Sequence, residues 1–160
     1  MKIDEVAIEA VEGHQLIVGQ AHFIKSVEDI YEALATSMPG IKFGVAFAEA
    51  SGKALVRFDG SDDGLASLAS DYAARIGAGH SFVVVLSGAF PINVLNRLKA
   101  VEEVAHLFCA TSNPVTVLVA DTGKGRGILG VVDGVSPKGV EGPGDKEERR
   151  EFLRRIGYKR

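Results

Sequence analysis

The sequence predicts a single α/β domain over residues 1–160, folded as a three-layer α/β/α sandwich around a mixed sheet. Apolar runs of strand length alternate with amphipathic helical patterns, and several of these runs are too hydrophobic to face water. A chain of 160 residues with 46% apolar composition has the size of one domain with one full core. Short, hairpin-like spacings between some strands favour a mixed sheet over a wholly parallel one.

The first half of the chain is expected to form four strands and two helices. The strand signals are Ile3 to Ile8, Leu16 to Val18 and onward to Phe23, Lys42 to Ala48, and Ala54 to Phe58. Ser26 is placed to cap the first helix, with Asp29 reaching back to it, and Met38-Pro39-Gly40 ends that helix. A second helix starts at Asp62 and Asp63 and stops at Gly77.

The second half should add four strands and two helices. The strand signals are Ser81 to Leu86, Ala105 to Ala110, Val115 to Ala120, and a run near Gly130. A helix begins at Pro91, where proline suits a first turn, and a loop rich in Pro and Gly spans 136–144. Asp145 and Glu148 form a capping pair for the last helix, which is expected to turn Phe152 and Ile156, together with Leu153, into the core.

Composition excludes several classes of protein. A formal net charge of −3 argues against general nucleic-acid binding. No window approaches the length of apolar sequence that a membrane span requires, and the first ten residues do not resemble a secretory signal. Cys109 is the single cysteine, so no intrachain disulfide forms, and its apolar neighbours predict a buried, inert thiol. We therefore expect a cytoplasmic protein that binds neither membrane nor nucleic acid.

A glycine-rich turn follows an apolar strand at Asn113 to Gly134 and contains a literal G-x-G-x-x-G. The run after it reads as a strand, so the dinucleotide-binding motif lacks its helix, and no Walker motif is present either. Backbone N–H groups at Gly123, Gly125 and Gly127 that face outward together, beside Lys124 and Arg126, would suit a phosphate or nucleotide. The alternative is a plain turn with two solvated cations.

Two carboxylates flank this region at strand ends, where ligands often bind in α/β proteins. Asp121 or Asp133 would serve as a Mg²⁺ ligand or a general base, or each would simply bond the backbone of its own turn. Asn113, before a proline, would contact a base or ribose with its amide, although starting a turn is its more common single role.

Charged side chains also line the earlier hairpin. Arg57, in the middle of a strand, would clamp a phosphate with its guanidinium or pair with Glu49 across the turn, and such a set is usually the solvated face of a sheet. His14 and His22 lack the spacing and the cysteine companions that favour zinc.

Several blocks of sequence, in order, resemble the adenosine-specific kinase family of archaea and some bacteria. They are GQAHFIKSVEDIYEAL from Gly19, GIKFGVAFAEASGKALVRFDG from Gly40, PINVLNRLKAVEEV from Pro91, CATSNPVTVLVADT from Cys109, GRGILGVVDG from Gly125 and RRIGYK from Arg154. The resemblance implies a three-layer α/β fold, homo-oligomers built on trimers (trimer or hexamer), and binding of adenosine or AMP. It also implies phosphoryl transfer to adenosine.

On that resemblance, the γ-phosphoryl of ATP would move to the ribose 5′-hydroxyl. Either Asp121 or Asp133 would accept the hydroxyl proton while the other holds Mg²⁺, and Lys124, Arg126 and the glycine amides would stabilise the transferred group. The nucleoside pocket would be completed by Asn113, Glu49 and Arg57. Two alternatives stay open: a sensor or storage protein that binds AMP without catalysis, and an oligomeric scaffold without a small ligand.

Overall fold

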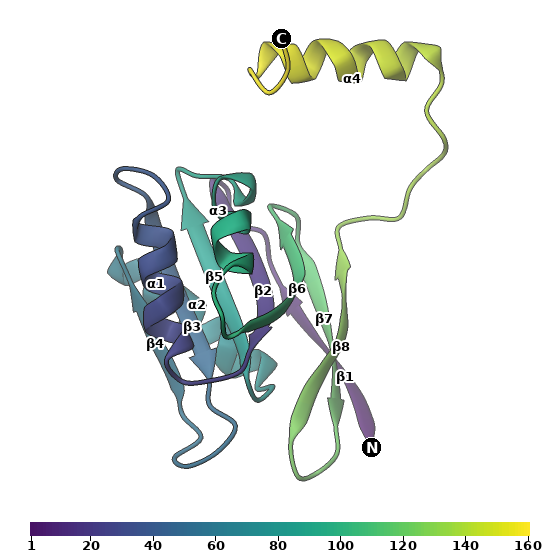
Figure 1. The fold of residues 1–160 in the computed structure, drawn as a ribbon. Helices are drawn as coiled ribbons and strands as arrows, with labels where there is room; N and C mark the ends of the chain where they lie inside the picture. Colours follow the sequence, from purple (N-terminus) through teal and green to yellow (C-terminus); the bar gives the residue numbers. More distant parts are fainter.

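The computed structural model describes all 160 residues, arranged as eight strands and four helices (Figure 1). Most elements lie where the sequence predicts them, within a few residues. In chain order they are β1 (Lys2–Ile8), β2 (His14–Ala21), α1 (Ser26–Ala35), β3 (Lys42–Ala48), β4 (Val56–Gly60), α2 (Asp63–Ile76), β5 (Ser81–Ser87), α3 (Pro91–Lys99), β6 (Val104–Thr111), β7 (Val115–Asp121), β8 (Arg126–Asp133) and α4 (Pro143–Arg155).

The strands form two sheets, and every pair of neighbours is antiparallel. A five-stranded sheet has the order β4-β3-β5-β2-β6, and a three-stranded sheet has the order β1-β7-β8. The predicted mixed sheet is therefore wrong, although the α/β class is right. Each helical crossover does join two strands that run in the same direction, but one antiparallel strand always lies between them: β5 separates β2 from β3, β3 separates β4 from β5, and β2 separates β5 from β6.

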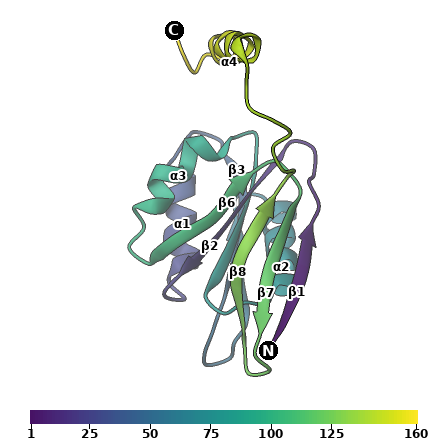
Figure 2. The same cartoon turned by 90° about the vertical axis from the view of Figure 1, so that its right-hand side faces the viewer.

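The two faces of the five-stranded sheet are covered differently (Figures 1 and 2). Helices α1 and α3 cover one face, where buried side chains such as Leu34, Phe43 and Leu98 pack together. Helix α2 and the three-stranded sheet share the other face. The expected sandwich, with helices alone on both sides of a single sheet, is corrected accordingly: a second sheet supplies part of one covering layer.

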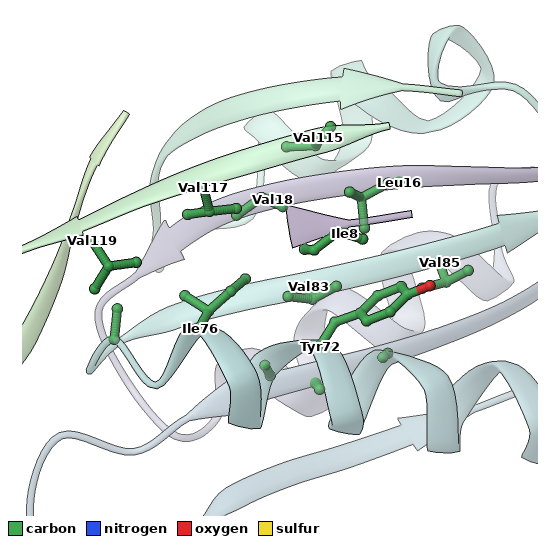
Figure 3. Close-up of a cluster of buried hydrophobic side chains, with 14 of the residues drawn as sticks. Ile8, Leu16, Val18, Tyr72, Ile76, Val83, Val85, Val115, Val117 and Val119 are labelled. Carbon is green, nitrogen blue, oxygen red and sulfur yellow. The ribbon is translucent and has the colours of Figure 1, made fainter. Parts of the chain in front are cut away.

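Side chains from both sheets and from α2 form the second core cluster (Figure 3). Tyr72 and Ile76 of α2 face the valines of β5 and β7. Helix α2 approaches the five-stranded sheet very closely at Gly44, where an added Cβ would lie only 2.1 Å from the Leu65 carbonyl oxygen. Only glycine fits there, and this contact fixes α2 against β3.

Helix caps were predicted with mixed success. Asp62 caps α2 as expected, since its carboxylate accepts a hydrogen bond from the Leu65 N–H at 3.1 Å. Ser26 does not cap α1: its hydroxyl is buried and has no hydrogen-bond partner, and the N-cap residue is Lys25. Asp145 lies inside α4 and accepts from the N–H of Gly142, the N-cap residue, so the predicted capping pair with Glu148 is wrong.

Helix α4 stands apart from the rest of the chain, at the end of an extended segment (Figures 1 and 2). None of its residues is buried, and Phe152 and Ile156 are 48% and 42% exposed. The prediction that they pack into the core is wrong, because no residue of the helix is buried or belongs to either core cluster. None of the four helices is long and apolar enough to span a membrane.

Candidate functional site

The predicted site residues divide between two ends of the molecule. We call the end that carries the β3–β4 and β7–β8 turns the lower end and the end nearer α4 the upper end, as drawn in Figure 1. Asp121 pairs with Arg126 at the lower end of the β7–β8 ladder, whereas Asp133 pairs with Val115 at its upper end. Six residues of strand separate the two aspartates along the ladder, about 20 Å at the usual rise per residue. One site therefore cannot use both.

At the upper end, Asp133 and Asn113 are engaged with each other. Asp133 Oδ1 accepts hydrogen bonds from Thr111 Oγ1 at 2.8 Å and from Asn113 Nδ2 at 3.0 Å. The Asn113 N–H in turn donates to Thr111 Oγ1 at 3.0 Å. This network ties the β6–β7 turn to the end of β8, so both residues have the turn role that the sequence left open.

The glycine-rich turn uses its own amides. The Gly123 N–H donates to Asp121 Oδ1 at 2.7 Å, and the N–H groups of Lys124 and Gly125 point to Thr122 Oγ1 at 3.4 and 3.2 Å. These amides face the turn's own side chains, and Gly127 is paired within the β7–β8 ladder. The expected outward-facing set of N–H groups for an anion does not form, because Asp121 and Thr122 occupy its donors.

Arg126 is likewise used within the fold. Its guanidinium donates to the Arg75 carbonyl at the end of α2 (3.3 Å) and to Asp4 of β1 (3.4 Å), and Asp121 lies 4.0 Å away. These contacts fasten α2 to the three-stranded sheet. Lys124 makes no ion pair and is the one cation of the turn that faces solvent unengaged.

Glu49 and Arg57 are paired at the lower end, beside the β3–β4 turn. Arg57 Nη2 donates to both carboxylate oxygens of Glu49, at 3.2 and 3.1 Å, and the Leu55 N–H donates to Oε2 at 3.0 Å. The Leu55 amide and then Arg57 hold the pKa of Glu49 below its usual value. Arg57 Nε is buried and has no partner. The pairing engages only Nη2, so the hydrogens on Nε and Nη1 are left for further acceptors.

Two histidines that the sequence did not single out for this role lie at the same end. The His80 ring stacks on buried Phe47, with centroids 5.7 Å apart, and meets the His22 ring edge-on at 6.4 Å. His80 has a φ of +62°, an unusual conformation for a residue other than glycine. Backbone hydrogen bonds to Ala48 and from Ala21 hold it there. The only sequence signal was the run of glycines before it, at Gly77 and Gly79.

An ion-pair cluster borders the histidines. Lys25 Nζ contacts Asp29 and also Glu103 Oε1, at 2.5 Å, and these two carboxylates raise the pKa of Lys25 above its usual value. The Glu103 carbonyl accepts the His22 N–H at 2.8 Å, so the cluster and His22 are joined through the backbone. Glu103 Oε2, like the Ser26 hydroxyl nearby in α1, is buried without a partner. Unpartnered buried polar atoms are uncommon, and an ordered water, an ion or a ligand can complete the bonding of each.

Open space adjoins these groups. A surface depression of about 400 Å³ lies between Arg57 and the start of α1, where Ile24 and Lys25 line it. A separate, smaller cavity of about 100 Å³ lies between Gly79 and Gly127 and is lined in part by the polar side chains of Gln20 and Ser81. Lys25 and Arg57 thus line a recess at the lower end, and the two imidazoles lie at the same end outside its lining.

The structure contains no group of three or more His, Cys, Asp or Glu placed to hold a metal ion. Asp121 and Asp133 are too far apart to share Mg²⁺, so a resident site built from both does not fit. Cys109 is free, and burial raises its pKa to about 11, which agrees with the predicted inert thiol.

Comparison with known proteins identifies the family of this chain. The model of a family described as adenosine specific kinase matches residues 6–159, nearly the whole chain. The chain belongs to the adenosine-specific kinase family. The chain is similar to the crystal structure of the PH1918 protein from Pyrococcus horikoshii OT3. The sequence identity is 46% and the TM-score is 0.95, over 99% of this chain and 98% of the PH1918 chain. No curated protein matches the chain.

Membership of the adenosine-specific kinase family confirms the resemblance seen in the sequence. It supports an adenosine-related kinase function in general terms. Trimeric or hexameric assembly, a cytoplasmic location and the individual site residues stay predictions.

Proposed function

We propose that this protein transfers the γ-phosphoryl group of ATP to the ribose 5′-hydroxyl of adenosine, yielding AMP and ADP, and that it does so at the lower end. The family match over residues 6–159 is the observation that carries the reaction. The clustering of Arg57 and Lys25 with unpartnered buried polar atoms supports the location. Phosphoryl transfer depends chiefly on positioning and on neutralising charge, and this cluster provides both.

Each group at the lower end has a role in this proposal. Arg57 and Lys25, which line the recess, contact oxygens of the transferred phosphoryl group. His22 accepts the proton of the 5′-hydroxyl as O5′ attacks the γ-phosphorus and the bond to the β-phosphate oxygen breaks. The exposed ring of Phe23, adjacent to His22, offers a face on which adenine can stack.

Mg²⁺ enters this proposal only as the complex with ATP. The usual protein environment of Mg²⁺ is one or two carboxylates together with substrate phosphates, so the lack of a dedicated cluster agrees with that route. Asp121 and Asp133 are not assigned the shared role of base and metal ligand, because the β7–β8 register separates them.

Chromatographic measurement of AMP and ADP formed from adenosine and ATP tests the reaction, with Arg57→Ala as the key variant. Loss of an electrostatic contact to the transferred group typically costs 10²–10³-fold in turnover, and we expect a loss of about that size. Adenosine binding, measured by calorimetric titration, should be largely kept. His22→Asn is expected to lower turnover in the same way.

Lys124→Ala is the matched control, because Lys124 is a cation at the same end whose side chain makes no ion pair. It should keep wild-type turnover, as should Asp121→Asn and Asp133→Asn. The proposed location is wrong if Lys124→Ala abolishes turnover while Arg57→Ala does not, because the glycine turn would then hold the phosphate. Urea unfolding of each variant separates loss of activity from loss of folding.

A second function is favoured by one observation: the amides of the glycine turn are bonded within the turn and leave no phosphate-binding loop for ATP. The protein would then bind AMP or adenosine without turnover. Saturable AMP binding, with no ADP formed from ATP and adenosine in preparations freed of contaminating kinases, would establish this alternative and exclude the transfer reaction.

A further inference from the structure

One ammonium group at the lower end is held between two carboxylates that come from different parts of the chain. Lys25 Nζ contacts Glu103 Oε1 at 2.5 Å and also contacts Asp29 Oδ2. Asp29 lies in the first turn of α1, whereas Glu103 lies in the turn between α3 and β6. Because both carboxylates contact the same nitrogen atom, they face each other across the position that this atom occupies.

The charges of this cluster do not balance. The carboxylates of Asp29 and Glu103 carry two negative charges and Lys25 carries one positive charge, so one negative charge is left over. The Lys25 side chain is half exposed, whereas that of Glu103 is only 9% exposed. Burying a carboxylate to that extent is costly unless its charge is compensated. A divalent cation in the place of the ammonium would neutralise the pair.

Glu103 also has a free acceptor. Its Oε1 contacts Lys25, while its Oε2 is buried and accepts no hydrogen bond. The Ser26 hydroxyl, next to Lys25 in the chain, is fully buried and likewise has no partner. The backbone of Glu103 is held in place, because its carbonyl accepts the His22 N–H at 2.8 Å. A fixed and incompletely bonded carboxylate beside a second carboxylate is a donor set suited to a hard divalent cation.

Lys25 lies between this pair of carboxylates and the recess in which the phosphoryl group is proposed to bind. Together with Arg57 it lines the recess, and neither Asp29 nor Glu103 does so. Lysine has a flexible four-carbon stem, so its ammonium can turn from one acceptor to another. A phosphate in the recess would therefore draw Lys25 away from the two carboxylates.

We propose that Asp29 and Glu103 are the protein ligands of a Mg²⁺ site, and that Lys25 Nζ takes the place of the metal ion until Mg²⁺ arrives with ATP. This assignment rests on the proposed phosphoryl transfer. Mg²⁺ is usually bound by one or two carboxylates together with substrate phosphates, with ligand oxygens at about 2.1 Å and water in the remaining positions. The carboxylate pair and the β- and γ-phosphate oxygens supply that set, while Lys25 moves to the transferred phosphoryl group.

Electron paramagnetic resonance of Mn²⁺, which prefers the same oxygen ligands as Mg²⁺, tests the site. It measures the binding of free Mn²⁺ and of its complex with the β,γ-imido analogue of ATP. Glu103→Gln should weaken binding of the complex by about tenfold or more, because a charged ligand is lost. Glu102→Gln is the matched control: Glu102 is the exposed neighbour and makes no ion pair, so wild-type binding is expected. Wild-type binding by Glu103→Gln overturns the assignment.

Lys25→Met gives the opposite prediction for the metal alone. Removing the ammonium leaves the two carboxylates without a cation between them, so free Mn²⁺ should bind about tenfold more tightly than to the wild type. The double variant Lys25→Met/Glu103→Gln should lose this gain. An affinity unchanged in Lys25→Met, or a gain that survives in the double variant, means that the metal binds elsewhere. Urea unfolding of each variant shows that it is folded.

Paramagnetic broadening of amide signals locates the ion in the wild-type protein and needs no substitution. With Mn²⁺ and the analogue, the signals of Asp29 and Glu103 should disappear, while that of Asn113, in the β6–β7 turn at the upper end, stays sharp. Broadening centred away from the pair overturns the assignment. A protein that binds the complex at the pair and forms no AMP keeps the metal site and loses the transfer reaction. AMP formation with the metal elsewhere has the reverse meaning.

Discussion

At the residue level, the two arginines of the lower end differ in the elements that they join. Arg126 donates to the α2 terminus and to Asp4, so its charge is used in holding elements together. Arg57 pairs only with Glu49, beside the β3–β4 turn, whereas a buried Nε without a partner is common to both arginines. The sequence presented both as candidate phosphate ligands, and only the three-dimensional contacts separate them.

Glu49 should make the stability of the protein depend on pH. Its pKa is lower in the folded protein than in an unfolded chain, so its carboxylate stabilises the fold above the usual glutamate pKa and loses this effect as the pH falls. We expect the unfolding free energy of Glu49→Gln to be lower than wild type at neutral pH and to fall less between about pH 6 and about pH 3. Urea unfolding across that range measures this.

Glu12→Gln is the control for that experiment, because Glu12 is exposed and makes no ion pair. It should reproduce the wild-type pH dependence. A Glu49→Gln curve that runs parallel to wild type at all pH values would show that the Leu55 amide and Arg57 do not favour the charged form.

The roles of some residues could be predicted from sequence because those roles depend on nearby residues. The turn roles of Asp121, Asn113 and Asp133 depend on neighbours a few residues away or on the adjoining strand, and the sequence offered them as alternatives. The sequence could not single out His80, because the residues that it contacts, Phe47, Ala21 and His22, lie on strands and turns distant in sequence. Nothing in the residues next to His80 reveals those contacts.

At the level of elements, boundaries were far easier to predict than partners. The strand Lys42–Ala48 lies where its apolar run predicts it, and Asp62 begins α2 as a cap. Sheet order did not follow, because every helical crossover skips a strand and the intervening strand comes from elsewhere in the chain. The spacing of helices in the sequence does not show which strand lies between the two strands that a helix joins.

Asp62→Ala should destabilise the protein through α2. The substitution removes the acceptor for the Leu65 N–H at the first turn of a helix that packs on both sheets. A lost N-cap typically costs about 0.5–2 kcal/mol, and we expect a fall of about 1 kcal/mol in the unfolding free energy. Asp63→Ala, which alters the neighbouring acidic residue without removing the cap, should cost clearly less in the same urea titration. Equal losses in the two variants would contradict the capping role.

At the level of the whole molecule, the chain divides into a body, residues 1–134, and an arm, residues 135–160, which contains α4 and adds nothing to either core. Both hydrophobic clusters, including the side chains packed around them, end at Val131. The sequence did predict an apolar face on α4, but an amphipathic pattern does not state which surface covers that face. This is why the inward packing of Phe152 was predicted wrongly.

A chain that ends at Gly134 is expected to fold with a near-native spectrum, because both hydrophobic cores lie within residues 1–134. Removing the arm takes away no buried side chain, so the unfolding free energy should change by no more than about 1 kcal/mol relative to the full-length chain. Circular dichroism and urea unfolding at low protein concentration measure this. A truncated chain that is unfolded under those conditions would show that the arm belongs to the body's own core.

The completion of both cores before the arm begins has a consequence for the order of events in the cell. Synthesis proceeds from the amino terminus and domains fold as units, so a nascent chain can finish its body while the arm is still being made. The arm is then added to a body that has already folded, and its synthesis delays neither core.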